Sequence, residues 1–81
     1  MILIKPLMTE KAVKMIETEN KIVFLVTRKS TKQEIKKEFE SVFDSKIESI
    51  NIQIRKNQKI AFIKLKEENG AINIATKLGV M

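Results

Sequence analysis

Residues 21–27 read KIVFLVT, a run rich in β-branched side chains that is apolar on both of its alternating faces. Successive side chains of a strand point to opposite faces of the sheet, so a strand with this pattern needs apolar cover above and below. We therefore expect this segment to be an inner strand of a sheet that has helices on both faces.

A short helix is expected before this strand, over residues 10–17. Pro6 disfavours helical geometry in the residue before it. Thr9 is a good N-cap, and Glu10 lies in the first turn, where the positive end of the helix dipole favours an acid. The apolar residues of this helix share one arc, which should face the sheet: Ala12, Val13, Met15 and Ile16.

A second helix should follow the strand and end near Phe43. Thr31 and Glu34 have the Thr-x-x-Glu spacing of a capping box, which marks a helix start. The apolar residues after it recur at helical spacing and predict a buried stripe made of Ile35, Phe39, Val42 and Phe43.

The second half of the chain predicts a β-hairpin and a last helix. Residues 46–55 alternate, with isoleucines at 50, 52 and 54, as in a strand with one buried face, and residues 59–66 form a further strand. Lys56, Asn57 and Gln58 separate the two strands as a short basic tip. A short amphipathic helix over residues 71–78 ends at Gly79.

Connection rules assemble these elements into an α+β fold. The strands starting at residues 21 and 46 are joined through a helix by a right-handed crossover, and the strand starting at residue 59 can lie between them as a split βαβ unit. The prediction is a mostly antiparallel sheet with helices on both faces, an α/β/α sandwich that is a ferredoxin-like variant. Residues 1–81 are expected to form one domain.

Composition excludes most catalytic chemistry. The chain has no Cys and no His, which removes disulfides, thiolate zinc sites, and the commonest nucleophile, general base and transition-metal ligands. The adjacent acids Glu17 with Glu19 and Glu67 with Glu68 lack the companions of a metal site. We predict no enzyme activity, no metal and no cofactor. Lys5 and Pro6 interrupt the apolar N-terminal run far below the length of a signal or spanning helix, which predicts a cytoplasmic protein.

The charge balance indicates a polyanionic partner. Sixteen Lys and Arg against ten Asp and Glu give a formal charge of +6 on 81 residues. Such a surplus favours nucleic acid, although a solvated basic surface would have the same composition. The cations that gather on the first helix, the loop entering the second helix and the hairpin tip are the candidate phosphate contacts: Lys11, Lys14, Arg28, Lys29, Lys32, Lys36, Arg55, Lys56 and Lys59.

Two further polar residues and the aromatic residues bear on recognition. Asn51, on the polar face of its strand, is either a hydrogen bonder to RNA or an outward polar residue. Glu10 is an exposed acid in a basic neighbourhood and could contact a partner. Its presence is also explained by the positive end of the helix dipole, which favours an acid in the first turn. The periodicity assigns all four phenylalanines to the core, and this predicts recognition through phosphate, sugar and shape rather than stacked bases: Phe24, Phe39, Phe43 and Phe62.

Several motifs of the chain occur together, in the same order, in one known family. The opening Pro6–Ala12, PLMTEKA, is similar to the Pro-x-x-(Ser/Thr)-Glu-Lys-Ala motif of the ribosomal protein L23 family of the large subunit. Further landmarks follow in the family's order along nearly the whole chain: Asn20–Phe24, the Thr31-Lys32-x-Glu34-Ile35-Lys36 motif, Phe43, the Ile50-Asn51 pair and the Lys59–Ala61 strand.

This resemblance implies a structural protein that binds rRNA near the polypeptide exit tunnel, beside neighbouring ribosomal proteins. It implies rRNA contacts by Lys11, Lys32, Lys36 and Asn51, and docking of exit-site factors, a chaperone or the signal recognition particle, at Glu10. Two departures stand out. The long tunnel-reaching hairpin of the bacterial branch is absent, as in a compact archaeal-like form, and Ile52 replaces the usual Thr after the Asn.

Two other classes of protein have a similar architecture. A free RNA-recognition-motif-like module would require aromatics on an exposed sheet face, and the periodicity offers none. A small acylphosphatase-like hydrolase would use an Arg and an Asn, for which Arg28 and Asn51 are the candidates, but no glycine-rich phosphate cradle precedes them.

Overall fold

The protein, described here by a computed structural model for residues 2–79, alternates short strands and helices along its chain. The elements are β1 (Leu3–Pro6), α1 (Glu10–Glu19), β2 (Lys21–Val26), α2 (Lys32–Phe43), β3 (Ile47–Arg55), β4 (Gln58–Leu65) and α3 (Gly70–Lys77). The strands form one antiparallel sheet of order β1-β2-β4-β3. Strand β4 therefore lies between β2 and β3, which makes β2 and β3 parallel to each other and confirms the predicted split βαβ unit.

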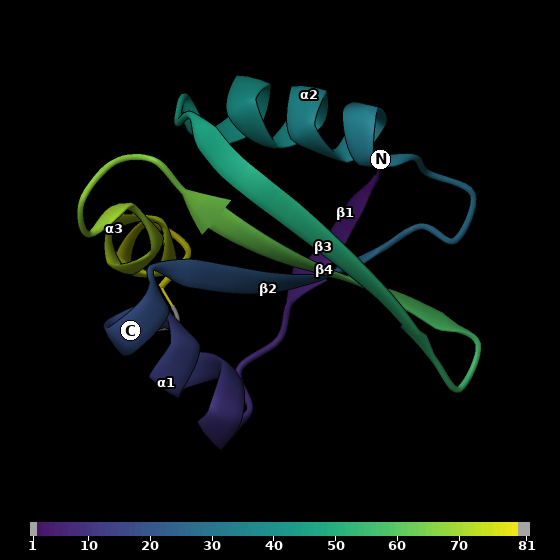
Figure 1. The fold of residues 1–81 in the computed structure, drawn as a ribbon, viewed down its shortest axis with the longest axis horizontal. Coiled ribbons are helices and arrows are strands. Elements are labelled where there is room, and N and C mark those ends of the chain that lie inside the picture. Colours follow the sequence, from purple (N-terminus) through teal and green to yellow (C-terminus); the bar gives the residue numbers. More distant parts are fainter. Residues whose placement is uncertain (1, 80–81) are drawn as a thin grey trace.

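Helices cover both faces of the sheet, as the two-sided apolar pattern of β2 predicted. In Figure 1, α2 lies above the strands and α1 below them, and α3 lies beside α1. Helix α3 packs against α1, β2 and β4. On β2, the neighbouring residues Val23 and Phe24 are both buried although they point to opposite faces. The predicted α+β sandwich is confirmed.

An aromatic cluster fills the core between the sheet and α2. Phe24 of β2 meets the ring of Phe39 edge to face, with centroids 5.8 Å apart, and Phe43 completes the cluster 4.8 Å from Phe39. Such ring pairs stabilise the fold beyond what the burial of their apolar area contributes. Three of the four predicted core phenylalanines are therefore confirmed in the core.

Both long helices begin at the predicted caps. The hydroxyl of Thr9 accepts a hydrogen bond from the backbone N–H of Ala12 at 3.1 Å. At α2, the Glu34 carboxylate accepts from the backbone N–H of Thr31 at 2.9 Å, and the Thr31 hydroxyl accepts from the N–H of Glu34. The capping box is thus confirmed. Sequence could predict it because its two hydrogen bonds join residues only three apart.

Two residues that the periodicity placed in the core are exposed. Val42 is 58% exposed because the buried row of α2 is the i, i+4 series Ile35, Phe39 and Phe43, and Val42 lies beside that row. Ile54 is also 58% exposed, because it is near the hairpin tip, where it pairs with Lys59. Both assignments from sequence were wrong.

Phe62 is the third correction. It pairs with Val23 and with Asn51, so its side chain lies on the sheet face opposite the Phe24 cluster, and it is only partly buried. The alternation of β4 explains this, because its neighbours Ala61 and Ile63 are fully buried on the α2 face.

The hairpin tip is shorter than the sequence indicated. Lys56 and Asn57 alone form it, both with positive φ, whereas Gln58 already pairs with Arg55. A two-residue tip with both residues in the left-handed region matches the right-handed twist of the flanking strands.

Among residues 2–79, every helix is too short or too polar to span a membrane.

Candidate nucleic-acid interface

The candidate cations do not form one patch, because the structure places them in three groups and one isolated residue. One group lines a groove beside α1, here called the α1 groove, with Lys11 and Arg55. A second, the α2 groove, has Lys32 and Lys36. The third, the hairpin end, comprises Arg28 and Lys29 of the loop before α2 together with Lys56 and Lys59 of the hairpin. Lys14 is exposed on α1 and lines neither groove.

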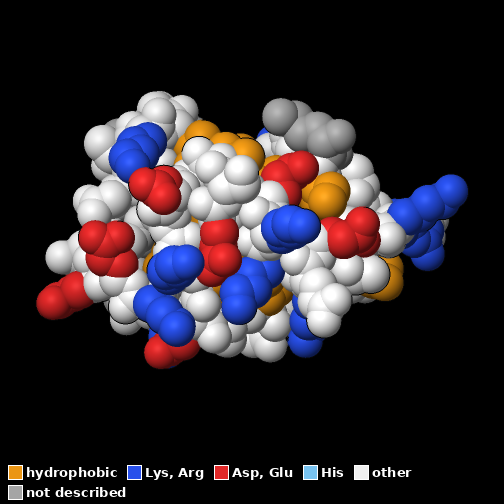
Figure 2. Space-filling view, turned by 90° about the horizontal axis from the view of Figure 1, so that it is seen from above, with side chains coloured by type: hydrophobic (Ala, Val, Ile, Leu, Met, Phe, Trp, Pro, Cys, Tyr) orange, Lys and Arg blue, Asp and Glu red, His pale blue; other side chains and the backbone are white. Residues whose placement is uncertain are grey.

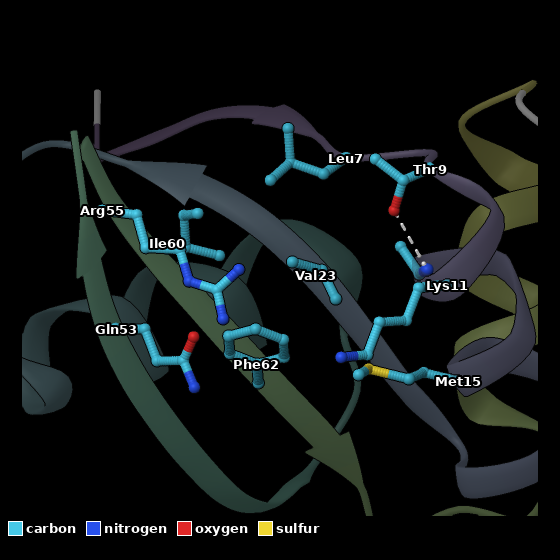
Figure 3. Close-up of a pocket in the computed structure, with 10 residues that line it drawn as sticks. Leu7, Thr9, Lys11, Met15, Val23, Gln53, Arg55, Ile60 and Phe62 are labelled. Atoms are coloured by element: carbon cyan, nitrogen blue, oxygen red, sulfur yellow. Dashed lines mark hydrogen bonds between the residues drawn. The ribbon is translucent and has the colours of Figure 1, made fainter.

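The α1 groove lies on the sheet face that α1 covers only in part. Its floor is apolar and its rim is polar, as Figure 3 shows: Leu7, Ala12, Met15, Val23, Ile60 and Phe62 are the apolar residues, and Thr9, Lys11, Gln53 and Arg55 are the polar ones. The cavity holds about 220 Å³. Asn51 belongs to the same sheet face, since it alternates with Gln53 along β3, and its side chain is exposed.

The α2 groove lies where α2 meets the beginning of β3. Lys32, Gln33 and Lys36 of α2 face the β3 segment 47–50 across a cavity of about 220 Å³. Both lysines are exposed, and their spacing of four residues puts them on the same side of the helix. The two side chains can therefore approach adjacent phosphates from a single helix.

Side-chain hydrogen bonds tie the hairpin end together. The Arg28 guanidinium donates to the Asn57 side-chain oxygen at 3.2 Å, and this links the loop before α2 to the tip. The Lys59 ammonium donates to the backbone carbonyl of Ser30, a buried residue. Lys59 is partly buried and already bonded, so it holds the loop in place rather than presenting a free ammonium.

Within residues 2–79, no candidate cation forms an ion pair with an acid, so their charges are not neutralised by the protein itself. Among residues 2–79, the ion pairs are Lys21 with Glu19 at 3.4 Å and Lys64 with Glu48 at 3.3 Å, and neither lysine is a candidate. All three acids of α2 are bonded to backbone instead, Glu34 through the capping box described above. Glu38 accepts from the N–H of Leu3 at 2.8 Å, and Glu40 accepts from that of Ile47 at 2.9 Å.

The surface charge is distributed unevenly. Figure 2, seen from the α2 side, shows acidic side chains among the lysines over the helix, whereas Lys and Arg alone project at the end where Figure 1 places the hairpin tip. Strand β3, at the edge of the sheet, separates the two grooves, since one lies on its α1 side and the other on its α2 side. The cations therefore surround this edge strand and its tip.

Sequence reasoning missed three residues of these grooves: Gln33, Gln53 and Phe62. A signal for Phe62 was present, because it alternates with the buried Ala61 and Ile63. Gln33 directly follows Lys32 on α2, so its place beside that lysine was already visible in the sequence. No local signal marked Gln53, which becomes a neighbour of Lys11 only when α1 packs on the sheet.

The comparison with known proteins accounts for the sequence landmarks together. The sequence model of the family described as "Ribosomal protein L23" matches residues 1–73. The chain belongs to the ribosomal protein L23 family. It is 45% identical over 80 residues to the large ribosomal subunit protein uL23 of Methanothermobacter thermautotrophicus, covering 98% of this chain and 93% of that relative. It is 43% identical over 76 residues to the uL23 of Methanococcus vannielii, covering 93% and 88%.

Membership in the L23 family establishes the class of function. A member is a structural constituent of the large ribosomal subunit, so this chain is not an enzyme, and its place is on cytoplasmic ribosomes with rRNA and ribosomal proteins as partners. Arg28 bonds to Asn57 at the tip, not to Asn51 in the middle of β3, so the pair considered for a hydrolase is not assembled. Both relatives are archaeal, in accord with the short hairpin of this L23 protein.

Proposed function

We propose that this chain, as one rRNA-binding unit over residues 1–81, clamps large-subunit rRNA near the polypeptide exit tunnel. The observation that carries the proposal is the placement of unpaired cations around β3. The α1 groove, the α2 groove and the hairpin tip each present Lys or Arg, and none of these cations forms an ion pair with an acid of residues 2–79. A polyanion that contacts all three groups would enclose the edge strand.

Each group has a distinct role in this proposal. Lys32 and Lys36 of α2 contact successive phosphates. At the hairpin end, Arg28, Lys29 and Lys56 contact the sugar-phosphate backbone of the rRNA. Lys11, Lys14, Asn51 and Arg55 serve the α1 side. Lys59 contributes indirectly, because its hydrogen bond to Ser30 holds the loop that carries Arg28 and Lys29.

We further propose that Glu10 contributes to the docking of an exit-site factor, a chaperone or the signal recognition particle. Glu10 is exposed in the first turn of α1 and forms no ion pair with a cation of the described residues. A free carboxylate beside basic residues offers a protein partner a distinct contact, because it can accept from a protein N–H or pair with a cation, and a phosphate provides neither.

The direct test is sedimentation of the native protein with large subunits. Ribosomes are purified from the source cells, washed in high salt and spun through sucrose, and the protein is quantified in the large-subunit fraction. We expect it to remain with the large subunit, since a primary rRNA binder is held by many contacts. Recovery of the protein in the soluble fraction at low salt, free of rRNA, would contradict the proposal.

A further inference from the structure

The α1 groove has an aromatic floor that phosphate contacts alone do not explain. Helix α1 covers Val23 on β2, but it leaves Ile60 and Phe62 on β4 only partly buried. The groove therefore keeps a small apolar floor, with one aromatic ring, open to solvent.

Two cations face this floor from opposite sides. Figure 3 shows Lys11 reaching from α1 and Arg55 from β3, with their charged ends directed toward Phe62 from two sides. The lining contains no acidic residue. Thr9, the one hydroxyl there, already accepts the hydrogen bond of the Ala12 backbone N–H. The groove therefore combines an apolar surface with an uncompensated positive charge, which favours an anionic occupant that has an apolar, flat part.

The β3 side of the groove adds hydrogen-bonding groups. Asn51 and Gln53 lie on the same sheet face as Arg55, and across the ladder Asn51 pairs with Phe62 and Gln53 with Ile60. A side-chain amide both donates and accepts, and this matches the mixed edge of a nucleobase. Single-stranded RNA is recognised in this way, by bases stacked on aromatic side chains and bonded at their edges.

An apolar peptide fits the groove less well. It would cover the charged ends of Lys11 and Arg55 without pairing them, and burying an unpaired charge is costly. An acidic peptide would pair the charges but would leave the Phe62 ring without a flat partner. The cavity of about 220 Å³ is smaller than the roughly 300–1,000 Å³ of typical small-molecule pockets, and it therefore suits a single base.

We propose that the α1 groove binds one unpaired nucleotide of the rRNA, with the base stacked on Phe62, its edge bonded to Gln53, and the flanking phosphates held by Lys11 and Arg55. This inference rests on the proposed rRNA binding and adds to it a stacking site. It departs from the expectation that recognition involves no stacked base.

The first experiment titrates the full protein with the oligonucleotide rA5 and follows the NMR spectrum. The Phe62 ring protons should move upfield, because a stacked base shields them. Inorganic tripolyphosphate is the control for charge alone, and it should shift resonances of Lys11 and Arg55 but not those of the ring. If rA5 and tripolyphosphate give the same pattern, the groove binds phosphate only and the stacking site is refuted.

The second experiment compares Phe62→Leu with the parent in binding to large-subunit rRNA. Leucine keeps the floor apolar, so the fold should survive, while loss of stacking should weaken binding about tenfold. The matched control is Ile4→Ala, an exposed apolar residue of β1 at the edge of the sheet opposite β3, which should bind as the parent does.

The outcomes separate this inference from the proposed function. If the parent does not bind rRNA, the proposed function fails and the nucleotide site fails with it. If the parent binds and Phe62→Leu binds equally, only the nucleotide site is overturned. Equal binding to free rRNA combined with weaker retention of Phe62→Leu on assembled subunits would also overturn it, and would assign the groove to a neighbouring protein.

Discussion

The side-chain oxygen of Asn20 accepts a hydrogen bond from the backbone N–H of Ala71 at 2.9 Å, across 51 positions of sequence. The side-chain nitrogen of Asn20 donates to the carbonyls of Leu65 and Glu67, at 3.0 and 2.8 Å. The residue itself lies at the C-cap of α1 with φ of 56°, a region that Asn tolerates better than most residues. One side chain thus joins the end of α1, the end of β4 and the start of α3.

Asn20→Ala should lower the free energy of unfolding by about 3 kcal/mol. The variant loses three hydrogen bonds, leaves the Ala71 N–H without its partner and puts a less tolerant residue in the left-handed region. Urea denaturation measures the change. Asn73→Ala, at an exposed position of α3, is the matched control and should stay within about 0.5 kcal/mol of the parent.

Phe39→Ala and Val42→Ala should differ sharply although the two residues are one helical turn apart. Phe39 is fully buried between α2 and the sheet, and its truncation should cost about 4 kcal/mol. Val42 is 58% exposed, and its truncation should cost no more than about 0.5 kcal/mol. Thermal or chemical denaturation measures both. Equal losses would show that the packing of α2 on the sheet differs from that described here.

Binding of rRNA should weaken steeply with salt. With on the order of six phosphate contacts, the affinity should fall about a thousandfold between 50 and 200 mM salt, because each contact releases condensed counterions. Filter binding with a large-subunit rRNA fragment across this range gives the slope. A nearly flat response would rule out an interface built on lysine and arginine.

Reversing both charges of the α2 groove should abolish detectable rRNA binding. Lys32→Glu with Lys36→Glu replaces two proposed phosphate contacts by repulsion and should also lower the salt slope by about two. The fold should persist, since both side chains are exposed.

A matched double variant separates position from net charge. Lys66→Glu with Lys77→Glu makes the same change in charge at exposed positions outside the proposed interface. This control should lose far less affinity. If both double variants bind equally weakly, net charge rather than the α2 groove determines affinity.

Glu10→Ala should leave rRNA affinity unchanged and weaken the docking of exit-site factors on ribosomes. Removal of an exposed carboxylate takes away no phosphate contact, whereas a protein partner loses a charged one. Cosedimentation of a purified factor with ribosomes carrying either form measures the difference. Glu17→Ala, an exposed acid further along α1, is the control, and equal docking by all three forms would refute the role of Glu10.

The sequence by itself determined the helix starts, the order of the three strands β2, β4 and β3, and the family; the place of β1 beside β2 was not predicted. The caps at Thr9 and at Thr31 with Glu34 depend on residues three apart, so tertiary packing is not needed to specify them. The two-sided apolar pattern of residues 21–27 required cover on both faces, and short connections left few topologies to choose from.

Only the tertiary structure decided which apolar residues remain exposed and which cations share a surface. Periodicity assigns a face to each side chain, but whether a helix reaches far enough to cover that face depends on helix length and crossing position. For this reason Ile54 and Phe62 were placed wrongly, whereas Val42 was misplaced because it lies beside the buried row of α2. The α1 groove, where Lys11 and Arg55 meet from opposite sides, could not be seen before the chain folded.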